Sequence, residues 1–387
     1  MNVYILNSCI KKRDYDGIVL NESDFHPCRP FFLDHPQIKP EAVDKIYIRG
    51  ILECHPYIRT ILRYCDYMLA KEGLLNIEFF NKYFDSFGYA VRSRNEWQYE
   101  LSLVFKNRIL LIEQDKGLYS YFRYKKIERF LPENDTIDRW SFGIVSDGRK
   151  NERILQIIDR IQSFKILEYE ILICGPAPAE VLPSHVRMLS DAELYIDLRI
   201  PISKKKNYII SEAQYNNLVV MHDRIIFSED WYEKMKLYGN YWDCLSCCII
   251  NEDNHINRMA DWGITSNKPS SLSLWNKIWP KTNILDYTEW SSDIYIAGGY
   301  FQIKKHLGIM LNPNLYWGEK EDADMSFRAY NDGVLFEFFA DNVLYSKGVR
   351  FQGRTYNNGL IHKLRCVLGA YRRYKQDLKE LAQYMEK

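Results

Sequence analysis

The sequence predicts an α/β protein of two domains, each built as a sheet with helices packed on it. Its 387 residues are more than a single hydrophobic core usually organises. Strand-like and helix-like segments alternate along the chain, which favours a mostly parallel, mixed sheet covered on both faces. The polar, proline-containing stretch LPENDTID, residues 131–138, interrupts this alternation. We therefore expect one domain over residues 1–135 and a second over residues 136–387.

The composition is that of an ordinary globular protein. Hydrophobic residues make up 47% of the chain and charged residues 27%, and the net charge of +1 gives no general signal for nucleic acid. The nine cysteines are odd in number and irregularly spaced, which indicates a reduced, cytoplasmic setting. Cys244 and Cys247 form a CxxC motif, but LSCCII predicts a buried strand, so zinc is the less favoured interpretation. The chain start becomes charged too early for a secretory signal, and no apolar run of about 18 residues indicates a membrane span.

Short apolar runs between polar turns define the elements of the first domain. We expect strands at Asn2–Leu6, Asp44–Arg49 and Gly73–Phe80, a helix at Ile58–Leu69, and closing strands at Trp97–Phe105 and Tyr119–Tyr124.

The second domain restarts as strand, helix, strand. We expect strands at Trp140–Val145, Glu170–Cys174, Leu194–Leu198 and Asn217–Met221, and helices at Glu152–Phe164 and Lys204–Glu212. In such sheets, ligands bind at the carboxyl ends of the strands. The basic, tyrosine-rich segment 362–387 predicts a surface helix packed on the sheet. The alternative is a peripheral helix attached to an anionic membrane face.

Acidic residues crowd into YWGEKEDADMSFRAY, residues 316–330, directly after a Trp-Gly pair. They are Glu319, Glu321, Asp322 and Asp324. Acids at a helix start each stabilise it by about 0.3–1 kcal/mol, which accounts well for Asp324. The helix dipole does not explain the Trp-Gly lead-in, so a cleft that needs a carboxylate base is the competing interpretation for Asp322.

Three segments in order resemble the A-type, Rossmann-like glycosyltransferases of the large family-2-like group. They are SFGIVSDGRKNERILQII at residues 141–158, the segment 202–231 and the segment 294–348. The resemblance covers residues 138–350. It implies a GT-A fold and transfer of a sugar from a nucleotide-sugar donor to a glycan or lipid-linked acceptor. Such enzymes work in cell-surface polysaccharide biosynthesis.

The resemblance also implies the residues that hold the donor. They are Ser146 and Asp147 at the nucleotide base, Lys204, Lys205, Lys206 and Asn207 near the phosphates, His222 and Asp223 at the metal motif, and Gly298 and Gly299 in the loop near the sugar. A diphosphate needs positive charge and N–H donors, and glycine lets backbone approach a ligand closely. The metal motif is commonly Asp-x-Asp, but this chain has His222-Asp223-Arg224. A divalent ion, Mn²⁺ or Mg²⁺, could still bind Asp223 and the phosphates, or a cationic side chain could replace it.

For the reaction itself, the resemblance implies that Asp322 is the general base of an inverting displacement. Glu321 would position the acceptor, and Trp317 would form an apolar wall for a sugar ring. The family often has a histidine after the next strand, where this chain has Ser346 and Lys347. His362 is a remote candidate for that place.

Residues 33–79 resemble the middle of class I S-adenosylmethionine methyltransferases, through the pieces VDKIY, ILEC and MLAKEGLL. The family's glycine-rich cofactor loop has no counterpart in LNSCIKKRDYDG, residues 6–17, so S-adenosylmethionine binding is not expected. The first domain would then be a degenerate scaffold, acceptor platform or dimer surface, with Glu53 and Cys54 structural. Two alternatives stay open, a methyltransferase acting on a sugar and a non-catalytic protein that binds a glycan or nucleotide.

Overall fold

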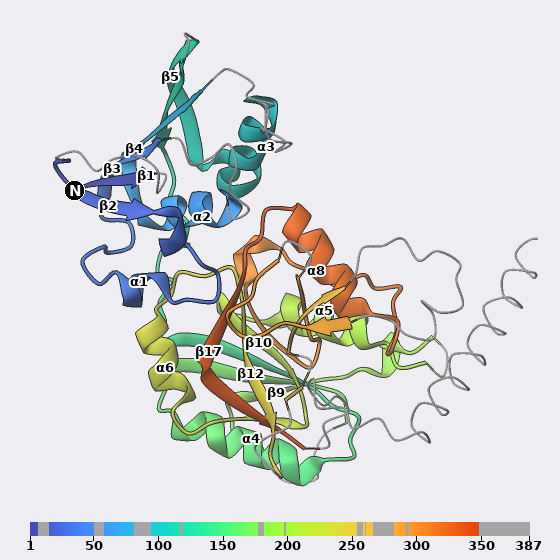
Figure 1. Ribbon diagram of the computed structural model, residues 1–387. Helices are drawn as coiled ribbons and strands as arrows, with labels where there is room; N and C mark the ends of the chain where they lie inside the picture. Colours follow the sequence, from blue (N-terminus) through green and yellow to red (C-terminus); the bar gives the residue numbers. More distant parts are fainter. Residues whose placement is uncertain are drawn as a thin grey trace, which may run out of the picture.

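The computed structural model, drawn in Figure 1, describes part of the chain. The described residues are 1–6, 15–49, 58–80, 94–116, 119–176, 182–196, 199–253, 258–259, 261–265, 282–291 and 294–347. Within them the chain is a mixed α/β protein with sheets of six, eight and three strands. No helix in those ranges is both long and apolar enough to cross a membrane.

The first sheet has the strand order β2-β1-β3-β4-β6-β5. Its strands are β1 (Asn2–Leu6), β2 (Ile18–Asn21), β3 (Val43–Arg49), β4 (Leu69–Phe80), β5 (Ile109–Lys116) and β6 (Tyr119–Lys126). The first four strands in that order run parallel, and β6 and β5 are antiparallel additions. The other elements are α1 (Phe31–Asp34), α2 (Ile58–Met68), α3 (Arg94–Phe105) and the 3-10 turns η1 (Glu22–Asp24) and η2 (Lys106–Arg108). Four of the five strands expected for this part are confirmed as β1, β3, β4 and β6, and the expected helix is confirmed as α2.

The expected strand at Trp97–Phe105 is wrong, because the segment is part of helix α3. Its apolar residues satisfy the helical period, since Leu101, Val104 and Phe105 are buried together. A contact between residues far apart in the sequence supports the helix, because Arg59 Nε of α2 donates to Glu100 Oε2 of α3 at 2.9 Å. Leu-, Val- and Phe-rich segments suit strands and helices alike, and this packing decides between them.

Helix α2 lies between the first sheet and the second (Figure 1), and all of its residues are buried. Arg63 Nε lies 3.0 Å from Asp243 Oδ2, and the Tyr64 hydroxyl donates to Glu337 Oε1 at 2.7 Å. Both acceptors belong to the part of the chain that forms the second sheet. The two sheets therefore share a buried layer of charged and polar side chains. Glu53, Cys54 and residues 7–14 of the cofactor-loop position lie outside the described residues.

The second sheet has the strand order β11-β17-β12-β16-β10-β7-β8-β9. Its strands are β7 (Arg139–Val145), β8 (Glu168–Cys174), β9 (Val186–Leu189), β10 (Asn217–His222), β11 (Ile225–Phe227), β12 (Cys244–Asn251), β16 (Tyr300–Lys304) and β17 (Phe336–Ser346). Strands β10, β7, β8 and β9 are parallel, whereas β16 runs antiparallel to β10 and β12. A small third sheet contains β13 (Trp262–Thr265), β14 (Thr282–Ile284) and β15 (Ile294–Ile296).

Helices cover both faces of the second sheet, as the sequence predicts (Figure 1). Helices α4 (Asn151–Ser163) and α6 (Trp231–Tyr238) pack on one face, and α5 (Ile202–Glu212) and α8 (Glu321–Asn331) pack on the other. Glycine permits one of these contacts. A Cβ on Gly143 of β7 would lie only 2.1 Å from Ile209 Cγ2 of α5, so the absence of a side chain lets α5 lie against the strand.

The expected strand at Leu194–Leu198 is also wrong as far as the structure describes it. Residues Ala192–Leu194 form the 3-10 turn η3, and Ile196 is 76% exposed. The third parallel strand is instead β9, whose Leu189 is buried. An alternation of apolar and polar residues forms a strand only where a neighbouring edge is in reach, and β9 takes the edge of β8. Residues 197–198 and the segment 362–387 lie outside the described residues.

The CxxC cysteines lie in strand β12, as LSCCII predicts. Cys247 packs in the core that contains α4 and α6, and Cys244 packs in the core on the other face, with α5 and α8. Side chains on opposite faces of a strand diverge, so this pair does not converge on one ion.

Candidate active site

The candidate site begins where the parallel neighbours β7 and β10 end. His222 is paired in register with Val145, the last residue of β7, so the residues that follow the two strands meet. The Asp223 backbone N–H donates to Val145 O at 3.2 Å. The Ser146 hydroxyl donates to Asp223 Oδ2, also at 3.2 Å. The carboxyl ends of parallel strands lie at one edge of a sheet, which explains why residues so far apart in sequence come together.

The second carboxylate oxygen of Asp223 faces a lysine that the sequence analysis did not single out. Lys150 Nζ lies 3.2 Å from Asp223 Oδ1. Lys150 is the residue before α4, at the end of a loop folded by a hydrogen bond from the Gly148 N–H to the Ser146 hydroxyl. Its position four residues after Ser146, in the loop after β7, is the sequence signal that could have found it.

The two glycines join this edge to the acidic segment. The His222 N–H donates to Gly299 O at 3.0 Å. The Gly298 N–H donates to Asp322 Oδ2 at 2.8 Å. A Cβ on Gly298 would lie 2.6 Å from Lys206 Nζ and 3.1 Å from Glu321 Oε1. Glycine at 298 is therefore required for the close approach of these charged groups.

The first turn of α8 presents the two candidate catalytic acids. Glu321 is buried and pairs with Lys206 Nζ at 3.1 Å, and the lysine side chain is itself fully buried. The second oxygen of Asp322, Oδ1, accepts the N–H of Ala323 at 2.9 Å. The carboxylate is thus fixed in one orientation by two backbone donors. Ser326 ties this turn to β15, because its hydroxyl donates to Asp322 O and accepts the N–H of Ile296.

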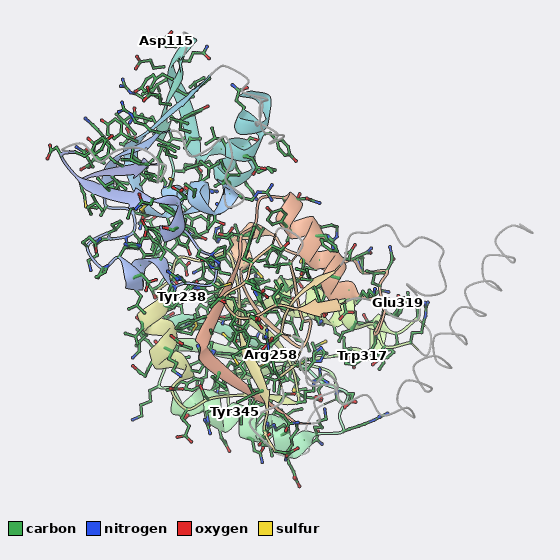
Figure 2. All side chains as sticks on the ribbon, in the orientation of Figure 1. Asp115, Tyr238, Arg258, Trp317, Glu319 and Tyr345 are labelled. Atoms are coloured by element: carbon green, nitrogen blue, oxygen red, sulfur yellow. The ribbon has the colours of Figure 1, made fainter. Side chains whose placement is uncertain are left out.

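An aromatic surface lies at the same place. The rings of His222 and Trp317 are stacked with centroids 5.2 Å apart and planes at 30°. Trp317 is 39% exposed, while His222 is buried. Figure 2 labels Trp317 with Glu319, just before the start of α8. A half-exposed indole backed by a second ring is a surface on which a sugar ring can pack.

Two of the predicted phosphate-binding residues of α5 have other partners. Lys205 Nζ lies 2.5 Å from Asp191 Oδ2 and donates to Ser146 O at 3.0 Å. The Asn207 amide exchanges two hydrogen bonds of 2.8 Å with the backbone of Leu311. These side chains hold neighbouring loops in place. Lys204 is partly buried on the same helix, and the exposed Asp147 accepts the N–H of Arg149.

Tyr295 of β15 is a further residue near the acids that sequence reasoning missed. Burial raises the pKa of its hydroxyl, and the carboxylates of Asp322 and Asp261 raise it further. The hydroxyl therefore remains protonated at neutral pH, with the Asp322 carboxylate in its surroundings. Its position in a strand of only three residues gave no sequence signal.

The donor set at Asp223 does not fit a resident divalent ion. Each carboxylate oxygen lies within hydrogen-bond distance of a donor, and one of these donors is the ammonium of Lys150. The next residue is Arg224, and the described residues contain no group of three His, Cys, Asp or Glu side chains arranged to hold a metal. Mg²⁺ and Ca²⁺ prefer several oxygen ligands. The metal at Asp223 that the resemblance implies therefore stays a prediction that these contacts do not favour.

Comparisons with known proteins place few constraints on the chain. No family model matches it, and no curated protein matches it. Among solved structures, it is similar to GalNAc-T7 with UDP, GalNAc and Mn²⁺ (15% identity, 61% of this chain and 48% of that one, TM-score 0.39). It is also similar to the Pyrobaculum calidifontis mannosyltransferase PcManGT with GDP-Man and Mn²⁺ (11% identity, 63% and 66%, TM-score 0.36). A third is S. aureus TarS 1-349 with UDP-GlcNAc (8% identity, 60% and 66%, TM-score 0.34). The chain spans about half the length of GalNAc-T7. All three TM-scores are below 0.5.

Proposed function

We propose that residues 136–387 form a glycosyltransferase that moves a sugar from a nucleotide-sugar donor to a hydroxyl of a glycan or lipid-linked acceptor. One observation carries the proposal. The Asp322 carboxylate, held at 2.8 Å by the Gly298 N–H, belongs to the same contact network as Asp223 and Ser146 at the ends of β10 and β7. This network joins part of the residue set that the sequence resemblance assigns to the donor site, namely Ser146, His222, Asp223, Gly298 and Gly299, to the proposed base.

The proposed reaction is a direct displacement. The acceptor hydroxyl gives its proton to Asp322 while its oxygen forms a bond to the anomeric carbon. The bond from that carbon to the diphosphate oxygen breaks, and the nucleoside diphosphate leaves with the electron pair. This single displacement inverts the anomeric configuration. A carboxylate held in one orientation suits the role, because a base must lie within hydrogen-bond reach of the proton that it removes.

The remaining site residues divide between the two substrates. Ser146 and Asp223 would lie at the donor, at the strand ends where ligands of open α/β sheets bind. The indole of Trp317, stacked on His222, would pack against a sugar ring. Glu321, paired with the buried Lys206, would orient the acceptor next to Asp322.

The test is donor turnover by the purified chain, screened with UDP- and GDP-sugars. Asp322→Asn keeps the size and one of the two acceptor oxygens but removes the base, so turnover should fall by about 10²–10⁴-fold with nucleotide affinity retained. Asp324→Asn is the matched control. Asp324 lies in the same first turn but pairs with the exposed Arg328 at 2.8 Å, so its turnover should be unchanged.

Equal turnover in Asp322→Asn and the parent chain would exclude Asp322 as the base. Nucleotide binding without turnover of any donor would favour a non-catalytic binding protein. Binding of S-adenosylmethionine without nucleotide binding would favour a methyltransferase.

The proposal for the first domain is a scaffold that resembles a methyltransferase without binding its cofactor. Buried α2 packs it against the second sheet. This is the arrangement expected of a supporting domain. Calorimetric titration with S-adenosylmethionine should therefore give no heat of binding. Light scattering of the full chain would decide whether this domain also serves as a dimer surface.

A further inference from the structure

We infer that Lys150 supplies the positive charge that the diphosphate of a nucleotide sugar needs, at the place where a divalent ion would otherwise bind. The inference rests on the proposed function and concerns the donor half of the same site. It assigns a phosphate contact to a residue outside the predicted donor set.

The geometry begins with Asp223. Its side chain is 7% exposed, and Lys150 Nζ lies 3.2 Å from its Oδ1. The Ser146 hydroxyl donates to Oδ2 at 3.2 Å. A divalent ion at this carboxylate would have to displace the ammonium or lie beside it, and two cations at one carboxylate repel each other. The buried carboxylate already has its counter-charge within the protein.

The Lys150 ammonium can contact a ligand while it stays paired with Asp223. The lysine side chain is 43% exposed, and an ammonium has three N–H donors. One donor lies toward the Asp223 carboxylate at 3.2 Å. The partly exposed side chain belongs to the loop between β7 and α4, at the edge of the sheet where the diphosphate is expected. Lysine is an established point-charge partner of phosphate groups.

Asp223 then has a different role from that of a metal ligand. It holds the Lys150 ammonium at the end of β7 and is a positioning residue. Removing either side chain of such a pair should give similar losses, and removing both should add little, because the two residues act as a unit. A metal ligand would behave otherwise, since Asp223→Asn would weaken binding only when the metal is present.

The experiment measures UDP and GDP affinity by calorimetry, once in EDTA and once in MnCl₂. We expect the parent chain to bind one of the two nucleotides equally well in both buffers. Lys150→Ala should weaken binding by about tenfold or more, the range of a charge-assisted contact, and Lys150→Arg should retain most of the affinity. The double variant Lys150→Ala/Asp223→Asn should bind about as weakly as Lys150→Ala.

The matched control is Lys234→Ala. Lys234 is also a partly exposed lysine that pairs with an aspartate, Asp230, at 2.8 Å, but it lies on α6, on the side of the sheet away from Trp317 (Figure 1 and Figure 2). Its loss should leave nucleotide affinity unchanged. Thermal unfolding of each variant checks that the fold is retained. If Lys150→Ala unfolds, Lys150→Gln keeps the test decisive, because it removes the charge but keeps a polar side chain that can still contact Asp223.

Two results overturn the inference in distinguishable ways. If the parent chain binds nucleotide only in MnCl₂, and Lys150→Ala binds as well as Lys234→Ala, a metal supplies the charge and the glycosyltransferase proposal stands. If the parent chain binds neither nucleotide in either buffer, the donor site itself is absent and the proposed function fails with the inference.

Discussion

The Gly298 backbone N–H donates a hydrogen bond of 2.8 Å to the carboxylate of Asp322. This contact joins a turn next to β16 to the first turn of α8, and it fixes the orientation of the proposed base. The crowding around this contact explains why residue 298 is a glycine. The space where a Cβ would lie is filled by Lys206, Glu321 and Asp322.

Gly298→Ala should therefore reduce turnover by about 10- to 100-fold, because small displacements of a catalytic group are costly. The new methyl group would lie 2.6 Å from Lys206 Nζ, and the buried lysine cannot withdraw without losing Glu321. Gly308→Ala is the control, since a Cβ there would meet nothing within 4 Å and the residue belongs to no part of the candidate site. Steady-state kinetics of both variants provide the check, and equal losses would contradict the explanation.

Lys206→Met should lower the stability of the chain by about 3–5 kcal/mol, because it leaves the buried Glu321 carboxylate without its counter-charge. The double variant Lys206→Met/Glu321→Gln should recover much of that loss. Urea unfolding measures both. Lys236→Met is the reference, since Lys236 pairs with the exposed Glu233 and such surface pairs contribute about 0–1 kcal/mol. A loss no greater than that of the reference variant would mean that the Lys206–Glu321 pair is not buried as described.

Trp317→Ala should raise the KM for the sugar acceptor or donor by about tenfold, the equivalent of 1.4 kcal/mol of lost contact, with a smaller effect on kcat. Trp317→Phe should preserve most of the affinity because it keeps an aromatic face beside His222. Leu237→Ala removes a side chain that is 63% exposed on α6 and is the control. An unchanged KM in Trp317→Ala would remove the indole from the substrate site.

Asn207→Ala tests two roles of this side chain. The resemblance implies a contact with the nucleotide, whereas the structure shows contacts with the loop at Leu311. The Asn207 amide holds the backbone of Leu311 through two hydrogen bonds, so the variant should lose about 1–3 kcal/mol of stability. Nucleotide affinity should change by less than about threefold, or less than 1 kcal/mol. Calorimetry and urea unfolding on the same sample separate the two outcomes. A large loss of affinity with full stability would restore Asn207 to the donor site.

The buried Glu337 predicts a pH dependence of stability. Burial raises the pKa of its carboxyl to about 8, above the value of about 4.3 for an unfolded glutamate. Between these two values the native chain keeps a proton that the unfolded chain has lost. The contribution of Glu337 to the free energy of unfolding therefore falls as pH rises from about 4.3 to about 8.

Glu337→Gln should flatten that part of the pH profile, because the amide does not ionise. Urea unfolding at a series of pH values between 5 and 8.5 measures it, with intervals of roughly half a unit across the window. Glu168→Gln, which replaces a carboxylate 42% exposed beside Arg139, should keep the profile of the parent chain. Parallel profiles for Glu337→Gln and the parent chain would place the titration elsewhere.

The elements that carry the site were predictable because their sequences leave little choice. Strands β7 and β10 are nearly continuous apolar runs, which predict strands buried on both faces. The structure buries both strands in this way. The helical spacing of isoleucines similarly predicts α4. Where the apolar residues suited two periods, as at Trp97–Phe105, local pattern did not decide, and the contact of α3 with α2 did.

The residues that we propose for glycosyl transfer, including Asp322, Glu321, Gly298 and Trp317, were identified from the sequence alone. Which of them act together was decided only by the tertiary structure. Lys150 meets Asp223 because β7 and β10 are neighbours in the sheet, and Asn207 turns to Leu311 because α5 packs beside that loop. Partners so distant along the chain are selected by strand order and helix packing, and these depend on the whole core rather than on any local stretch of sequence.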